Sequence, residues 1–149
     1  MCFGELFLQC RRACLPHLQR VVDLLLISCD CVMHLSDQNY AEVLQETVIE
    51  TFMCLFHGLN EGAQPCAPLG KYLRHVFEFV SLTTEKTRRP KLDYVKSCMF
   101  LLADIAGFYR VEAKSFASMP FLADRMSTLE KYNKKGDLSQ VINYVRSKF

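Results

Sequence analysis

Three prolines divide the 149-residue chain at equal intervals. Pro16, Pro68 and Pro120 are each separated by 52 residues (68 − 16 and 120 − 68). Each stands at the start of a run whose apolar residues recur every three or four positions, which is the period of an amphipathic helix. Proline is tolerated in the first turn of a helix and resisted in its interior, so each proline marks a helix start. The spacing therefore predicts a repeat of about fifty residues built from helices.

A second amphipathic segment follows each of these helices after a polar turn. The three segments are "YAEVLQETVIETFMCLFHGL", "KLDYVKSCMFLLADIAGF" and "DLSQVINYVRSKF". Asp37 and Asp137 are suited to cap the first and third segments, and Pro90 stands at the first turn of the second. Gly58 and Gly107 lie near the ends of the first two segments, as glycines that end helices do. Each repeat is thus expected to be a pair of helices.

Counting back by one period places the first dozen residues in the second-helix position of an earlier repeat. We expect half a repeat at residues 1–12 and three antiparallel helix pairs at residues 15–59, 67–109 and 113–149. No strand pattern and no long linker interrupts them. The predicted fold is all-α, a single right-handed α-solenoid of HEAT repeats, with a closed helical bundle as the alternative. The missing first helix further predicts that the chain is a fragment of a longer protein.

Charge and hydropathy exclude two classes of partner. The net charge of +2 gives no whole-chain basis for nucleic-acid binding, and the aromatic residues fall mostly at core spacing, unlike an exposed stacking platform. Charged residues interrupt both N-terminal apolar runs, which argues against a signal peptide and against a membrane-spanning helix. We therefore expect a soluble chain with no nucleic-acid and no membrane partner.

The eight cysteines and four histidines form no recognisable catalytic or metal-binding motif. Most cysteines lie within apolar helical pattern, where a free thiol packs as a small hydrophobic group, and no C-x-x-C pair is present. The sequence also lacks a glycine-rich phosphate loop and a G-x-S-x-G motif. We expect a reducing compartment and no catalytic residue, metal or cofactor. A metal- or thiol-dependent helical enzyme is the alternative, which elemental analysis of the purified chain would test.

Acidic residues on the second helices form the candidate partner-binding site. Glu42, Glu46 and Glu50 recur at every fourth position and so line one helix face. Comparable positions on the other second helices are also acidic, and the full set is Glu5, Glu42, Glu46, Glu50, Asp93 and Asp104. Second helices line the concave side of a two-helix solenoid, so these carboxylates would form an acidic wall for a basic peptide. A solvated helix face without a binding function is the alternative.

Three stretches of the sequence resemble the carboxyl-terminal HEAT repeats of importin-β, the nuclear import receptor of the karyopherin family. They are "CFGELFLQCRRACLPHLQRVVDLL", "ETVIETFMCLFHGLNE" and "YLRHVFEFVSLTTEKTRRPKLDYVKSCMFLLADIAGFY". In each, a small-acidic-aliphatic cluster, a helix-ending glycine and a long loop occur in the family's order. The resemblance covers residues 2–116, while residues 121–149 look like the family's final helix pair but match loosely. The chain lacks the tryptophan that family members often place near the end of the binding groove, where Tyr144 or Phe149 would be a poor substitute.

The resemblance implies a non-catalytic fragment of a transport receptor. Its second-helix surface would bind the basic importin-β-binding segment of importin-α, or a basic cargo, with Glu46, Glu50, Asp93 and Asp104 in the site. Ran and phenylalanine-glycine nucleoporins would be bound through the full-length receptor, in the cytoplasm, in the nucleus and at the nuclear pore. A HEAT-repeat scaffold of a phosphatase, kinase or trafficking complex is the alternative. Recovery of importin-α, Ran or nucleoporins from a lysate would separate the two.

Overall fold

A computed structural model describes residues 3–60, 64–86, 91–133, 136 and 138–149. Over these residues the backbone forms α-helices and one 3-10 helix and contains no β-strand, so the predicted all-α class is confirmed. None of the described helices is both long enough and apolar enough to span a bilayer. The chain divides into two compact units, Met1–Ala67 and Pro68–Phe149. Pro90 and Asp137, which the sequence places at helix starts, lie outside the described residues.

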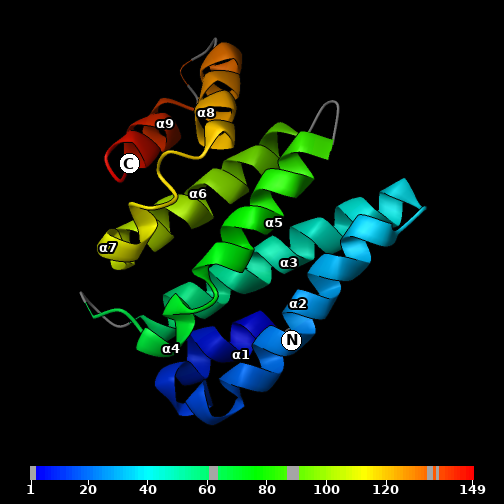
Figure 1. Cartoon of the computed structure of the whole chain (residues 1–149), viewed down its shortest axis with the longest axis vertical. Helices are drawn as coiled ribbons and strands as arrows, with labels where there is room; N and C mark the ends of the chain where they lie inside the picture. The colour runs from blue at the N-terminus through cyan, green and yellow to red at the C-terminus, as the bar shows by residue number, and fades with distance from the viewer. Residues whose placement is uncertain (1–2, 61–63, 87–90, 134–135, 137) are drawn as a thin grey trace. The chain divides into compact units, whose positions relative to one another are not determined.

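The first unit contains two long antiparallel helices and a shorter one that precedes them (Figure 1). Its elements are α1 (Phe3–Cys10), the 3-10 helix η1 (Arg11–His17), α2 (Leu18–His34) and α3 (Gln38–Leu59). Pro16 lies inside η1, directly before α2, so the expected helix start is a 3-10 turn that continues into the α-helix. The predicted cap at Asp37 is confirmed, because its carboxylate accepts a hydrogen bond from the Tyr40 N–H at 3.1 Å.

Helices α1 and α3 pack closely along each other and run in the same direction. Gly4 lies against Cys54, and Phe7, further along α1, lies against Gly58, further along α3. A Cβ atom at Gly58 would lie only 2.2 Å from the Phe7 carbonyl oxygen, so this approach requires a glycine. Equivalent helices of stacked repeats run parallel, because each repeat is related to the next by a small rotation. A parallel α1–α3 contact is compatible with a second-helix position for residues 1–12, which stays a prediction.

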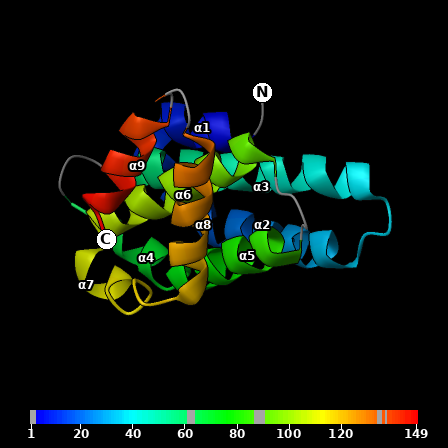
Figure 2. The ribbon, with the colours of Figure 1, turned by 90° about the horizontal axis from the view of Figure 1, so that it is seen from above.

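The second unit is organised around one central helix. Its elements are α4 (Ala67–Gly70, at the unit boundary), α5 (Leu73–Lys86), α6 (Leu92–Phe108), α7 (Arg110–Ala113), α8 (Pro120–Tyr132) and α9 (Ser139–Arg146). Pro68 and Pro120 stand in the first turns of α4 and α8, which confirms both as helix starts. The helix that Pro68 begins ends at Gly70, however, and the amphipathic run after it forms the separate helix α5 from Leu73. Helix α6 contacts α5, α7, α8 and α9, and in both views α9 lies beside it (Figures 1 and 2).

Aromatic rings and one buried hydroxyl pair hold the core of the second unit together. The Phe77 ring, fully buried on α5, stacks on Phe116 with ring centroids 4.6 Å apart and makes a T-shaped contact with Phe149 with ring centroids 6.5 Å apart. In the same core, the Tyr94 hydroxyl on α6 donates a hydrogen bond to the Thr83 Oγ1 on α5 at 2.8 Å. Both of these polar groups are buried, so the bond avoids the cost of unpaired polar atoms and fixes α6 against α5.

Candidate functional site

The acidic residues of α3, Glu42, Glu46 and Glu50, lie on one side of the helix, and we call them the α3 acidic row. The packed side of the helix is apolar, with Val48 and Leu55 almost fully buried, and this burial fixes how the helix is oriented. Glu42 and Glu46 are half-buried, whereas Glu50 is exposed. The sequence expectation that these three residues share a side of the second helix is consistent with this burial pattern.

The row winds around the helix because its spacing does not match the helical period. Four residues exceed one turn by about 40°, so each glutamate is rotated relative to the one before it. Glu42 consequently lies nearer the packed side than Glu50 does, and the exposed Gln38 donates from its Nε2 to the Glu42 Oε1 at 3.3 Å. Glu50 lies at the open side of α3. Glu50 is thus better presented to a partner than the half-buried Glu42 and Glu46.

Glu5 belongs to the same unit as the α3 acidic row. It is exposed in the first turn of α1, which packs along α3 through its glycine contacts. A carboxylate in the first turn also interacts favourably with the positive end of the helix dipole. Glu5 therefore has a local stabilising role besides the binding role expected for it.

Asp93 and Asp104 lie on the least buried face of α6, but their surroundings differ. Asp93 is exposed in the first turn of the helix. Asp104 is half-buried, near the C-terminal end, where α9 packs against α6. Of the two, Asp93 is the carboxylate whose exposure suits an external partner.

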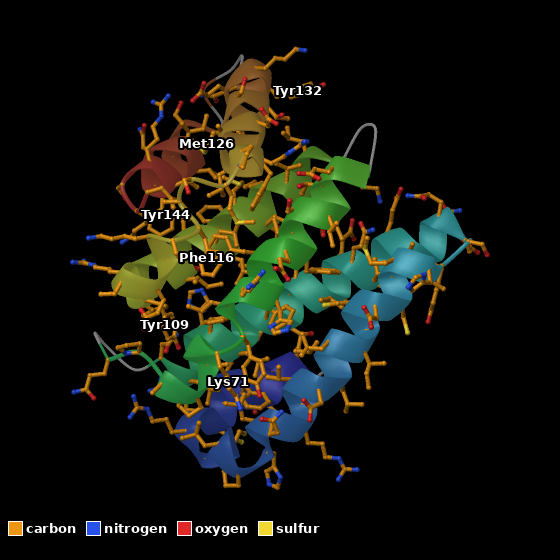
Figure 3. All side chains as sticks on the ribbon, viewed as in Figure 1. Lys71, Tyr109, Phe116, Met126, Tyr132 and Tyr144 are labelled. Carbon is orange, nitrogen blue, oxygen red and sulfur yellow. The ribbon has the colours of Figure 1, made fainter. Side chains whose placement is uncertain are left out.

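The Tyr144 hydroxyl on α9 donates a hydrogen bond to the Asp104 carboxylate. Its ring lies 5.8 Å from the Phe100 ring, and the Lys148 Nζ is 5.2 Å from the Tyr144 ring centroid (Figure 3, Tyr144 labelled). Burial, together with this bond to Asp104, raises the pKa of Tyr144 to about 12. Asp104 therefore already has an intramolecular partner, which the sequence expectation of a concave binding residue did not include.

Replacing Tyr144 by phenylalanine tests this bond. Tyr144→Phe should lower the free energy of unfolding at pH 7 by about 1.5 kcal/mol, because it removes a hydrogen bond to a charged acceptor. Since the pKa of Tyr144 is raised from 10.0 to about 12, the stability that this shift contributes is present below pH 10 and lost as the pH rises toward 12. Urea unfolding at several pH values should show that the free energies of unfolding of the parent chain and of Tyr144→Phe converge over that pH range. A difference that stays constant with pH would contradict the bond.

Two of the described cysteines, Cys29 and Cys98, lie in surroundings that disfavour the thiolate. None of them forms a disulfide; Cys66 and Cys98 are buried, but Cys10 and Cys31 are exposed, so burial as a small hydrophobic group does not hold for most of them. Burial raises the pKa of Cys98 to about 12, and burial together with the nearby Asp30 does the same for Cys29. A raised pKa disfavours the thiolate, which is the reactive and metal-binding form. Over the described residues, no three histidine, cysteine or acidic side chains gather where they could hold a metal ion.

Comparison with known proteins identifies the repeats of the chain but assigns no role to single residues. Residues 1–129 match the family model described as "Importin subunit beta-1-like, TPR repeats". Searches of curated proteins and of solved structures gave no significant match. The match confirms the expected family resemblance and the fold class of stacked helical repeats; TPR and HEAT units are both helix pairs. The chain thus belongs to the importin subunit beta-1-like repeat family.

Proposed function

We propose that the chain is part of a non-catalytic nuclear transport receptor and binds basic segments of importin-α or of cargo through its second helices. The observation that supports this proposal most directly is the α3 acidic row. It places Glu50 at the open side of a helix whose other side is packed, with the half-buried Glu46 one turn before it. Three carboxylates in line repel one another on an isolated helix, so they do not serve helix stability.

The binding mechanism is electrostatic attraction followed by hydrogen bonding. Carboxylates on the open side of α3 attract lysine and arginine side chains and accept charge-assisted hydrogen bonds from them. Because these contacts are exposed, each contributes modestly, and affinity depends on several of them acting together. Within the second unit, Asp93 on α6 would make a contact of the same kind. Asp104 would contribute less, since Tyr144 already donates to it.

The other partners and the cellular location follow from family membership and remain part of this proposal. Ran and phenylalanine-glycine nucleoporins would bind a full-length receptor that contains this region. The receptor would act in the cytoplasm and the nucleus and pass through the nuclear pore. No partner is proposed among nucleic acids or membranes.

Charge reversal on the α3 acidic row tests the proposal. The variant Glu46→Lys/Glu50→Lys should bind a fluorescein-labelled basic amino-terminal peptide of importin-α at least about tenfold more weakly than the parent chain, because two attractions become repulsions. Fluorescence anisotropy at low salt measures the affinity. Parent binding should also weaken as salt is raised, since exposed charges are screened.

A matched control separates local binding from the change in net charge. Asp23→Lys/Asp30→Lys reverses two exposed carboxylates on α2 and changes the net charge by the same amount. It should bind the peptide within about threefold of the parent. Equal losses in the two double variants would assign the effect to overall charge, and an unchanged affinity in Glu46→Lys/Glu50→Lys would reject the site.

A further inference from the structure

A cavity of about 370 Å³ lies in the second unit, between the end of α6, α7 and the residues that follow α9. Three small side chains, Ala106, Ala113 and Ala117, leave it open. The Phe149 ring lines another part of it; Phe149 is 41% exposed, although its ring also makes a T-shaped contact with the buried Phe77. This volume falls in the range of pockets that hold small ligands or single side chains with adjoining backbone.

The charged side chains that line this cavity are all cationic. They are Arg110 on α7, Lys114 directly after it and Lys148 after α9, and we call the cavity they line the cationic pocket. Over the residues that the structure describes, none of the three forms an ion pair with a carboxylate. Three like charges converging on one concavity create a positive potential that favours an anionic ligand. This potential is opposite in sign to that of the α3 acidic row.

Two contacts hold Lys148 at the edge of the cationic pocket. Its Nζ lies 5.2 Å from the Tyr144 ring centroid, a cation–π distance. Its stem passes Gly107 of α6, where a Cβ atom would be in ordinary van der Waals contact with the lysine Cε at 3.6 Å. Lys148 is therefore partly ordered before any ligand binds, which lowers the entropy cost of binding.

We propose that the cationic pocket binds an acidic peptide segment of a partner protein, with aspartate or glutamate carboxylates on Arg110, Lys114 and Lys148. The alanine side and the exposed part of the Phe149 ring would accept an apolar residue adjacent to the acidic ones. The pocket takes a carboxylate through arginine in a bidentate geometry and through lysine as a point charge. The chain would then carry two docking sites of opposite charge, one on α3 and one at its final helices.

A peptide fits the pocket better than a nucleic acid does. Nucleic-acid affinity comes from many phosphate contacts along an extended basic surface, and single strands also need aromatic side chains on which successive bases stack. Here three cations line one concavity, and the pocket has one aromatic ring, Phe149, which packs against Phe77 in a T-shaped arrangement. A concave site with small apolar side chains instead suits one or two side chains of an extended segment.

Anisotropy titration of the full chain with a short, end-capped, fluorescein-labelled peptide of repeated Asp-Asp-Leu tests the proposal. A Gly-Ser-Gly extension after Phe149 is added to every variant, so that the terminal carboxylate lies away from the pocket. The parent chain should bind the peptide, and Arg110→Glu/Lys114→Glu should weaken binding at least about tenfold. Ala117→Phe should also weaken it about fivefold without any change in charge, because Ala117 is exposed and its replacement would fill the cavity.

Two controls make the outcome decisive. Arg20→Glu/Lys131→Glu changes the net charge equally at exposed positions outside the pocket and should keep the parent affinity. Circular dichroism and thermal unfolding verify that each variant is folded. Absence of peptide binding to the parent chain, or equal losses in both double variants, would overturn the proposal. Tighter binding of single-stranded oligothymidylate than of the peptide, lost in Arg110→Glu/Lys114→Glu, would assign the pocket to nucleic acid and overturn it as well.

Discussion

Gly58→Ala is expected to lower the free energy of unfolding by about 3 kcal/mol. The added Cβ would lie 2.2 Å from the carbonyl oxygen of Phe7 and 2.6 Å from its carbonyl carbon. Both are backbone atoms of α1, so the clash cannot be relieved by rotating a side chain, and α1 must move away from α3. The higher helix propensity of alanine, worth about 1 kcal/mol, does not offset this loss of packing. Urea unfolding followed by circular dichroism measures the change.

Gly70→Ala is the matched control for this prediction. It makes the same substitution in a helical glycine, but the nearest atoms to the new Cβ are Tyr109 ring carbons at 3.9 and 4.0 Å, an ordinary contact. Its stability should remain within about 1 kcal/mol of the parent chain. Similar values for the two variants would show that α1 does not depend on its close approach to Gly58.

The two glycines near the ends of second helices show what the sequence could predict and what it could not. Helical period and proline positions are local properties, so they predicted the helices of both units. Gly58 and Gly107 were placed near helix ends on the same local grounds, and α3 ends at Leu59 and α6 at Phe108. Each glycine also faces a distant part of its unit, Phe7 in one case and Lys148 in the other. Such contacts depend on tertiary packing and leave no local pattern.

The candidate site was predictable to a similar extent. The four-residue spacing placed Glu42, Glu46 and Glu50 on one helix, because side-chain position along a helix follows from sequence alone. The differences in exposure along this row depend on what packs against α3. The partner of Asp104 was not predictable, since Tyr144 lies 40 residues further along the chain. Arg110 and Lys114 are four residues apart, a spacing that can be read from the sequence, but only the fold brings Lys148 close to them.

Phe77→Ala is expected to lower the free energy of unfolding by about 4 kcal/mol. Phe77 is fully buried, and its ring stacks on Phe116 and makes a T-shaped contact with Phe149. Truncation removes the transfer free energy of a large apolar group, leaves a cavity and breaks two aromatic contacts. Thermal and urea unfolding should both show the loss, and Phe77→Leu, which retains much of the volume, should lose about half as much.

Tyr132→Ala serves as the control. This aromatic residue is 58% exposed, so its replacement should lower the free energy of unfolding by less than about 1 kcal/mol.

The comparison of these variants also tests the cationic pocket. Phe149 lines that pocket while its ring packs against Phe77, so a loss of Phe77 should leave Phe149 without this support. Phe77→Leu, which should remain folded, is therefore expected to weaken binding of the acidic peptide, whereas Tyr132→Ala should not. Equal stability of Phe77→Ala and Tyr132→Ala would contradict the central place of Phe77 in this core.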